Sequence, residues 1–206
     1  MKTILRNLSL MLGVLISLCS CFDIWVNPIS DVKDSKIDER LIGTWIHKND
    51  PDDEIIIHIH ELDEHSVYLY VVTPKALCDP DYVEAHVSDV DERTFLNWRT
   101  FDCNTKEFSR YLILEYEFNG ENEVVFYYTD YDFVREAISN KRLSGNILDG
   151  DTMDVVGTIV VTAPSSEIKE FIKNSPKENL FYRDDPYILK RFERPKDTRR
   201  STCILF

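Results

Sequence analysis

The feature that most constrains this chain is a series of short stretches in which apolar and polar residues alternate. In 82–87, for example, Val83, Ala85 and Val87 fall on one face of an extended chain, because side chains on a strand alternate between faces with a period of two. Turn-forming pairs such as Asn119-Gly120 separate these stretches. The pattern predicts short strands at 43–48, 54–62, 66–73, 82–89, 93–100, 110–118, 123–129, 157–162 and 187–193.

Two stretches have a helical period instead. Each of 132–142 and 165–174 carries one stripe of apolar side chains at helical spacing. Ser165 is expected to cap the second helix, and Glu167 suits its positive start. We expect both helices to pack against a sheet.

A run of short strands with few helices suits an antiparallel sheet closed into a barrel, since closure leaves no exposed sheet edge. Two tripeptides, Gly43-Thr44-Trp45 and Thr129-Asp130-Tyr131, resemble the two signatures of the lipocalins, in the order in which that family has them. The resemblance spans roughly 41–193 and implies a mainly β domain over 41–194: an antiparallel eight-stranded lipocalin-like barrel with two short helices. On this reading 157–162 is the eighth strand.

The resemblance also implies roles for particular residues. In lipocalins the Trp of the first signature plugs the closed end of the barrel, and an Arg packs over it. The matching Trp is Trp45, and Arg191 and Arg194 are the candidates for the Arg. The second match departs from the family pattern, because Thr129-Asp130-Tyr131 follows the predicted seventh strand rather than the sixth.

The first 21 residues, MKTILRNLSLMLGVLISLCSC, resemble the signal peptide of a bacterial lipoprotein. Lys2 and Arg6 precede a short apolar run that is too short to span a bilayer, and the small Ser20 stands before Cys21. In that class of protein the segment before the Cys is removed. Residues 1–20 would therefore be the signal peptide, and Cys21 would become the acylated first residue.

The leader predicts a lipid-anchored protein of the cell envelope. Phe22 rather than Asp follows Cys21, which favours the outer membrane, facing the periplasm, in a Gram-negative host. An ordinary secretory signal that contains cysteines is the alternative. Residues 21–40 are polar and acidic and are interpreted as a tether, and 195–206 as a basic flexible tail.

The chain is strongly acidic. Its net charge is −13, and it becomes −15 once the leader, with its two basic residues, is removed. Such a surface repels nucleic acid, so we expect no nucleic-acid partner. A basic protein of the envelope would fit it better.

Two cysteines of the body, Cys78 and Cys103, both lie in turn-like sequence. In an exported protein they could pair, and a disulfide of this loop length would contribute roughly 3 kcal/mol to stability. Two free thiols are the alternative. The sequence leaves both open.

His58 and His60 lie two apart on a predicted strand and His65 follows in a turn, so the three could bind a metal ion such as Zn²⁺. The competing interpretation is a solvated strand face, because the opposite face is rich in Ile. We expect no metal or other cofactor. The sequence also lacks a Gly-x-Ser-x-Gly elbow, a P-loop and a Gly-x-Gly-x-x-Gly run, which disfavours an enzyme.

Aromatic residues are frequent on the predicted strands: Tyr68, Tyr70, Trp98, Tyr116, Phe118, Phe126, Tyr127 and Tyr128. Some must pack the core, and the rest could line a pocket for an apolar ligand. The leading hypothesis is an envelope lipoprotein whose barrel binds a small hydrophobic molecule. The alternatives are a ligand-free protein-interaction module and a metal-dependent hydrolase built on the histidines.

Overall fold

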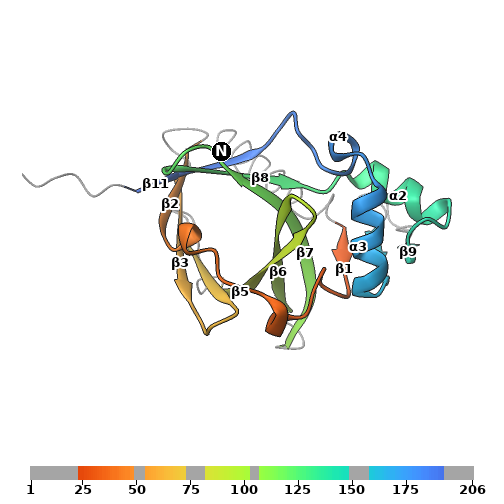
Figure 1. Ribbon diagram of the computed structural model, residues 1–206, viewed down its shortest axis with the longest axis horizontal. Coiled ribbons are helices and arrows are strands. Elements are labelled where there is room, and N and C mark those ends of the chain that lie inside the picture. Colours follow the sequence, from red (N-terminus) through yellow and green to blue (C-terminus); the bar gives the residue numbers. More distant parts are fainter. Residues whose placement is uncertain (1–22, 49–53, 73–81, 103–106, 149–157, 193–206) are drawn as a thin grey trace, which may run out of the picture.

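The computed structural model describes residues 23–48, 54–72, 82–102, 107–148 and 158–192 (Figure 1). Most of these residues form strands. The strands are β1 (Ile24–Trp25), β2 (Gly43–Lys48), β3 (Glu54–Glu61), β4 (Val67–Val72), β5 (Tyr82–Val90), β6 (Arg93–Asp102), β7 (Glu107–Phe118), β8 (Glu123–Tyr128), β9 (Gly145–Leu148), β10 (Thr158–Val161) and β11 (Tyr187–Arg191). The helical segments are η1 (Val32–Asp34), η2 (Glu39–Leu41), α2 (Tyr131–Ser139), α3 (Ser165–Asn174) and α4 (Lys177–Leu180).

Eight of the strands form a closed antiparallel barrel, which confirms the predicted fold class. Strands β2 to β8 pair in succession along the chain, and β11 lies between β8 and β2 and closes the ring. This is the up-and-down arrangement in which no barrel strand is left with an open edge. Figure 1 shows the barrel, with the α-helices gathered at one side of it.

The inward-facing side chains form one apolar core, because alternate residues of every strand point to the barrel axis. The register places Trp45 beside Ile57, and Leu96 beside Leu114. The buried members of this core are Leu41, Trp45, Ile57, Ile59, Val67, Leu69, Ala85, Val87, Leu96, Leu114, Tyr116, Val124, Phe126 and Leu189.

A side layer of three strands branches from β7. The later part of β7, from Leu114 to Phe118, pairs with β8, whereas Tyr111 pairs with Trp25 of β1. Strand β1 runs parallel to β10, and β10 pairs with β9. The stretch 157–162 was expected as the eighth barrel strand. It forms β10 in the side layer instead, and β11 is the eighth barrel strand, because β1 provides β10 with a partner outside the barrel.

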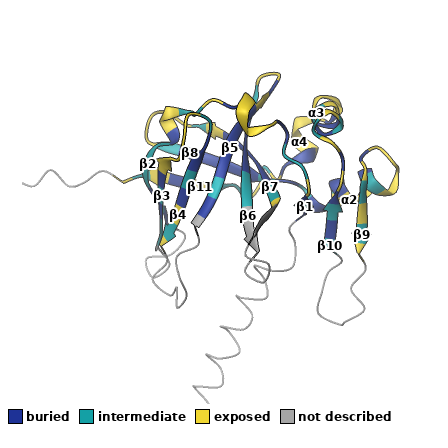
Figure 2. Ribbon diagram, turned by 90° about the horizontal axis from the view of Figure 1, so that it is seen from below, coloured by how far each residue is buried: buried dark blue, intermediate teal, exposed yellow. Residues whose placement is uncertain are grey.

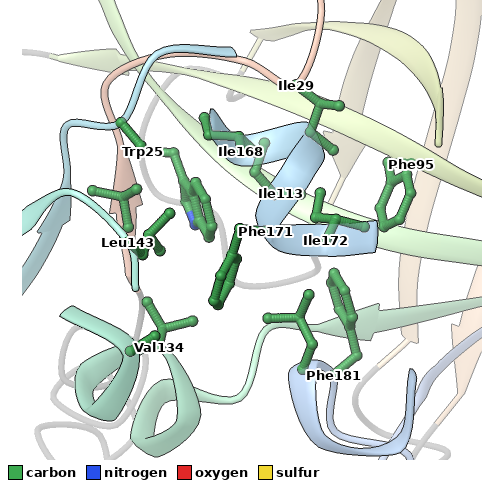
Figure 3. Packing of buried hydrophobic residues seen from close by; sticks show 14 of the residues in the cluster. Trp25, Ile29, Phe95, Ile113, Val134, Leu143, Ile168, Phe171, Ile172 and Phe181 are labelled. Atoms are coloured by element: carbon green, nitrogen blue, oxygen red, sulfur yellow. The ribbon is translucent and has the colours of Figure 1, made fainter. Parts of the chain in front are cut away.

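A second apolar core lies between the barrel wall, the side layer and the three α-helices (Figures 2 and 3). Phe95 and Ile113 reach it from the outer faces of β6 and β7, while Phe171 and Ile172 come from α3. Strands β6 and β7 are therefore buried on both faces. Burying a side chain of this size contributes roughly 1.5–3 kcal/mol, so the side layer is an integral part of the fold.

Part of the segment interpreted as a tether, 21–40, is packed into the fold, whereas the residues of η1 within it are exposed. Trp25 is 1% exposed, and Ile29 is fully buried. The Ile29 amide donates to Asn97 Oδ1 at 2.8 Å, and the Ser30 and Ser88 hydroxyls lie 2.5 Å apart. Polar side chains of the segment thus bind buried polar side chains of the barrel wall, so its polar composition does not keep it in solvent.

Both predicted α-helices are present, with small corrections. Helix α2 begins at Tyr131, where the Asp130 side chain accepts a hydrogen bond from the Phe133 amide at 2.9 Å. Helix α3 has the predicted bounds, but Pro164 occupies its N-cap position. The Ser165 hydroxyl does not cap the helix; it donates to the Pro28 carbonyl oxygen at 2.7 Å and so joins α3 to the N-terminal segment.

Candidate functional site

One end of the barrel is sealed around Trp45. Its indole Nε1 donates to the Leu41 carbonyl oxygen of η2 at 2.7 Å, and both residues are fully buried. The Arg191 guanidinium of β11 lies over the Trp45 ring, 4.3 Å from its centroid. It also donates to the Ile42 carbonyl oxygen at 3.0 Å. Of the two candidates for the arginine over the tryptophan, Arg191 occupies that place; Arg194 lies outside the described residues.

Gly43 makes room for this arginine. Its φ is +139°, and a Cβ built on it would lie 2.8 Å from Nη1 of Arg191. Residues other than glycine rarely adopt that backbone conformation. Gly43, Trp45 and Arg191 therefore form one closed unit at this end of the barrel, which we call the sealed end.

The inward-facing side chains at the opposite end are packed less completely. Those of Ile55, Val71, Trp98, Leu112, Tyr128 and Tyr187 border the barrel core, and each keeps part of its surface accessible to solvent. They lie on six different strands, toward the ends of the strands that are remote from Trp45. We call this set, together with His47, the aromatic end. It is the part of the barrel core whose side chains keep contact with solvent.

His47 is the polar group of the aromatic end. It follows Trp45 on the inward face of β2 and is 6% exposed. Its ring stacks on Tyr187 with centroids 3.9 Å apart, and Tyr187 in turn meets Tyr128 edge to face at 6.5 Å. The imidazole Nδ1 lies 2.8 Å from the Ile188 carbonyl oxygen. Its Nε2 is buried and has no hydrogen-bond partner among the described residues.

The tyrosines of the aromatic end are uncharged. Burial raises the pKa of the Tyr187 phenol, and the neighbouring Tyr128 raises it further; burial also raises the pKa of Tyr128. Both phenols therefore keep their protons at any physiological pH. The side chains of this set are apolar or aromatic with few polar atoms, which is the usual character of a small-molecule site. Arg110, two residues before Leu112 on the same face of β7, is exposed.

The second lipocalin-like tripeptide lies away from the sealed end. Thr129 directly follows β8, the seventh barrel strand, and its hydroxyl donates to Asp23 Oδ1 at 2.5 Å. Asp130 caps α2, and Tyr131 is buried in the second core. Asp23 also accepts a hydrogen bond from the Trp25 indole at 2.9 Å, and burial raises its pKa. The structure thus uses this tripeptide to fasten the N-terminal segment and α2, and does not bring it to Trp45.

The three histidines considered as metal ligands do not converge. His58 and His60 project from the outer face of β3, where Thr44 Oγ1 lies 2.9 Å from His58 Nδ1 and the His60 ring stacks on Tyr68. His65 lies in the next turn, with its Nδ1 2.9 Å from the Ser35 carbonyl oxygen. Among the residues that the structure describes, no group of three potential ligands is placed to hold a metal ion. Cys21, Cys78 and Cys103 lie outside the described residues.

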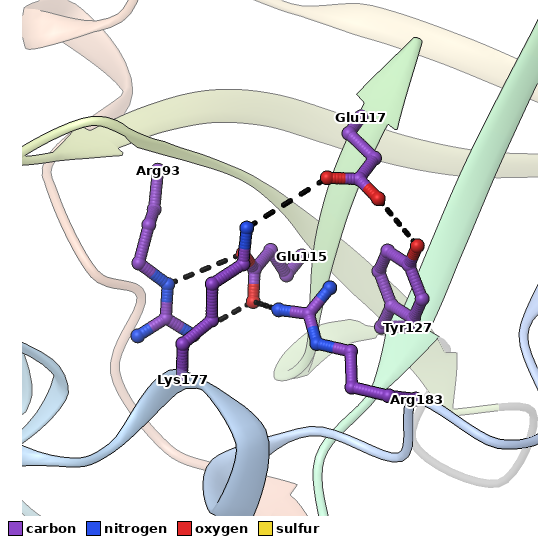
Figure 4. Close-up of polar contacts among 6 residues, drawn as sticks. All are labelled: Arg93, Glu115, Glu117, Tyr127, Lys177 and Arg183. Carbon is purple, nitrogen blue, oxygen red and sulfur yellow. Dashed lines mark hydrogen bonds and ion pairs between the residues drawn. The ribbon is translucent and has the colours of Figure 1, made fainter. Parts of the chain in front are cut away.

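A second cluster of polar residues lies on the outer wall of the barrel (Figure 4). Glu115 of β7 is 3% exposed and pairs with Arg93 at 2.7 Å and with Arg183. Lys177 of α4 joins it at 3.8 Å. Burial alone would raise the pKa of Glu115, but hydrogen bonds from Arg93 and Arg183 outweigh burial and hold the pKa below its usual value. Its partners are cations, and two of them, Lys177 and Arg183, fix α4 and the following chain to the barrel, so this cluster is structural.

The fold and the two ends of the barrel define a class of protein. Its members are closed antiparallel barrels with one sealed end and one aromatic end that is accessible to solvent. Comparison of the chain with family models, curated proteins and solved structures found no significant match. Across the described ranges, none of the helices has the length and apolar character needed to cross a bilayer.

Part of the aromatic end is predictable from the sequence, but its polar group, His47, is not among the predicted pocket residues. Trp98 and Tyr128 were among the candidate pocket residues, whereas His47 and Tyr187 were not. A usable signal existed for His47, because it lies two residues after Trp45 on the same strand and so shares the inward face. The sequence signal for Tyr187 is weaker, because its side chain can be assigned to the barrel interior only once β11 is known to close the barrel.

Proposed function

We propose that this protein is an envelope lipoprotein, anchored through Cys21, whose barrel binds a small hydrophobic molecule at the aromatic end. In a Gram-negative host it would face the periplasm from the outer membrane. The observation that carries the binding proposal is the contrast between the two ends. Trp45 and Arg191 close one end, whereas apolar and aromatic side chains at the other face inward and still meet solvent.

Physical chemistry supports this interpretation of the contrast. Inward apolar side chains that stay in contact with water leave hydrophobic free energy unused, at roughly 25 cal/mol for each Å². A hydrophobic ligand recovers that free energy when it covers them. Aromatic rings add stacking surface for a flat ligand.

Two neighbouring valines of β4 provide a test. Val71 faces into the barrel at the aromatic end, while Val72 is 38% exposed on the outside. We expect Val71→Trp to weaken binding of the neutral fluorophore N-phenyl-1-naphthylamine by about tenfold or more, which corresponds to about 1.4 kcal/mol, because the added indole occupies the ligand's space. Fluorescence titration of the purified full chain measures the affinity.

Val72→Trp is the matched control, since it adds the same side chain one residue away on the other face. It should leave the affinity unchanged. Equal affinities of the two variants, or no saturable binding to the wild-type chain, would refute binding at the aromatic end. Native mass spectrometry with solvent extraction would then identify any molecule that copurifies with the wild-type chain.

A further inference from the structure

His47 places a buried hydrogen-bonding atom inside an otherwise apolar surface. Two contacts hold the ring. Tyr187 stacks on one face with the ring centroids 3.9 Å apart, and Nδ1 at the ring edge lies 2.8 Å from the Ile188 carbonyl oxygen. Nε2 is the ring nitrogen farther from the backbone, and it has no partner in the described part of the chain. Leaving such a buried polar atom unpaired costs free energy.

The hydrogen bond to Ile188 determines whether Nε2 donates or accepts a hydrogen bond. A carbonyl oxygen has no proton to give, so the proton of that hydrogen bond is on Nδ1. In the tautomer that this bond selects, Nε2 carries a lone pair and acts as an acceptor. The ligand group that can pair with Nε2 is therefore a hydrogen-bond donor. A carboxylate would need a second proton on the ring, whereas a hydroxyl or N–H group needs none.

We infer that the ligand of the aromatic end is a flat, uncharged molecule whose buried edge carries a hydroxyl or N–H group that donates to His47 Nε2. This inference rests on the proposed function and specifies the class of ligand. Trp98, Tyr128 and Tyr187 supply aromatic surface around the flat body. The donor satisfies the one orphaned atom that His47 presents.

A pair of probes that differ only in the donor tests this assignment. 1-Naphthol carries a hydroxyl group, and 1-methoxynaphthalene has the same ring system without the donor. We expect the wild-type full chain to bind 1-naphthol about tenfold more tightly, which is the size of one net hydrogen bond. His47→Phe keeps an aromatic ring for stacking on Tyr187. This variant should bind the two probes equally, because it should weaken the binding of 1-naphthol and leave that of 1-methoxynaphthalene unchanged.

His60→Phe is the control, because it makes the same change on an exposed residue of the outer face. It should keep the preference for 1-naphthol. A second measurement does not need the His47 variant: in ¹⁵N NMR of side-chain-labelled wild-type protein, 1-naphthol should shift the Nε2 resonance of His47, and 1-methoxynaphthalene should not.

The outcomes separate the two proposals. If both probes bind but His47→Phe keeps the wild-type preference, or if the Nε2 resonance does not respond to 1-naphthol, the donor assignment is wrong and the binding function stands. Absence of saturable binding of either probe to the wild-type chain would overturn the binding function, and the donor assignment with it.

Discussion

At the scale of single residues, the sealed end depends on a position without a side chain. Gly43 lets the Arg191 guanidinium reach the Trp45 ring and the carbonyl oxygen of Ile42. A cation over the face of a Trp ring is favourable by roughly 0.5–2 kcal/mol. The Gly-x-Trp pattern therefore has a physical reason in this chain: the glycine serves the arginine, and the arginine covers the tryptophan.

Gly43→Ala should lower the free energy of unfolding by about 2–3 kcal/mol, because it combines an unfavourable φ with displacement of Arg191. Urea denaturation monitored by tryptophan fluorescence measures the change. Gly120→Ala is a useful control, since Gly120 also has a positive φ, +75°, but no atom lies within 4 Å of the added Cβ. A loss at Gly43 no larger than that at Gly120 would contradict the crowding argument.

At the scale of elements, one buried carboxylate connects three parts of the chain. Glu115 of β7 binds Arg93 of β6, Arg183 beyond α4, and Lys177 within α4. Arg183 also lies over the Tyr127 ring at 3.9 Å. A four-residue helix such as α4 has little stability of its own, so these contacts hold it in place.

Glu115→Gln should destabilise the protein by about 3 kcal/mol at neutral pH, since it leaves the guanidinium groups of Arg93 and Arg183 without their buried partner. The pKa of Glu115 is depressed in the folded state. Its contribution is therefore complete above the ordinary glutamate value of 4.5 and is lost as the pH falls from there toward the lower folded value.

Denaturation curves measured between neutral and acidic pH should consequently converge for wild type and Glu115→Gln as the pH falls. Glu117→Gln on the same strand is the control. Glu117 also pairs with Lys177, at 3.7 Å, but its side chain is half exposed, so a small effect is expected. Parallel curves for wild type and Glu115→Gln across the acidic range would show that Glu115 does not carry this pH dependence.

The barrel was predictable from the sequence because each strand is long enough to show its alternation, as in Val83, Ala85 and Val87. The side layer was not predictable in the same way. Strand β1 has only two residues, and the Ile29 amide and the Ser30 hydroxyl are buried against Asn97 and Ser88, partners far away in the chain. Hydropathy cannot detect burial that depends on such polar pairs.

The candidate site was predictable only in part, for a related reason. Alternation assigns Trp98 and Tyr128 to strands. Only the pairing register of the strands around the closed barrel shows which side chains share one end of it. The orphaned Nε2 of His47 is a property of the folded site, because it depends on Nδ1 being held by Ile188 of a distant strand.

At the scale of the whole molecule, the barrel and the side layer share β6 and β7. Leu96 and Leu114 face the barrel interior, while Phe95 and Ile113 face the second core. The two cores are therefore joined back to back through one wall. The N-terminal segment enters this shared structure at Trp25, close to the point where we propose the lipid to be attached.

The proposed lipid anchor is testable by metabolic labelling. In a bacterial host grown with alkyne-palmitate, we expect the wild-type chain to be labelled and to fractionate with membranes, and Cys21→Ser to lose both properties. Cys19→Ser is the matched control and should be labelled like wild type, because only Cys21 follows a small residue suited to cleavage. Labelling of Cys21→Ser would rule out this residue as the acylated position.

The hydrogen bond between Thr129 and Asp23 has a consequence for how such a molecule would stand on a membrane. Asp23 is buried, and Thr129 directly follows Tyr128 of the aromatic end. Two residues of chain span at most about 7 Å, so acyl chains on Cys21 would begin within that distance of a rigid point beside the aromatic end. If Cys21 is acylated as proposed, this short link would keep the aromatic end near the membrane surface, so a hydrophobic ligand would have only a short distance to travel between bilayer and barrel.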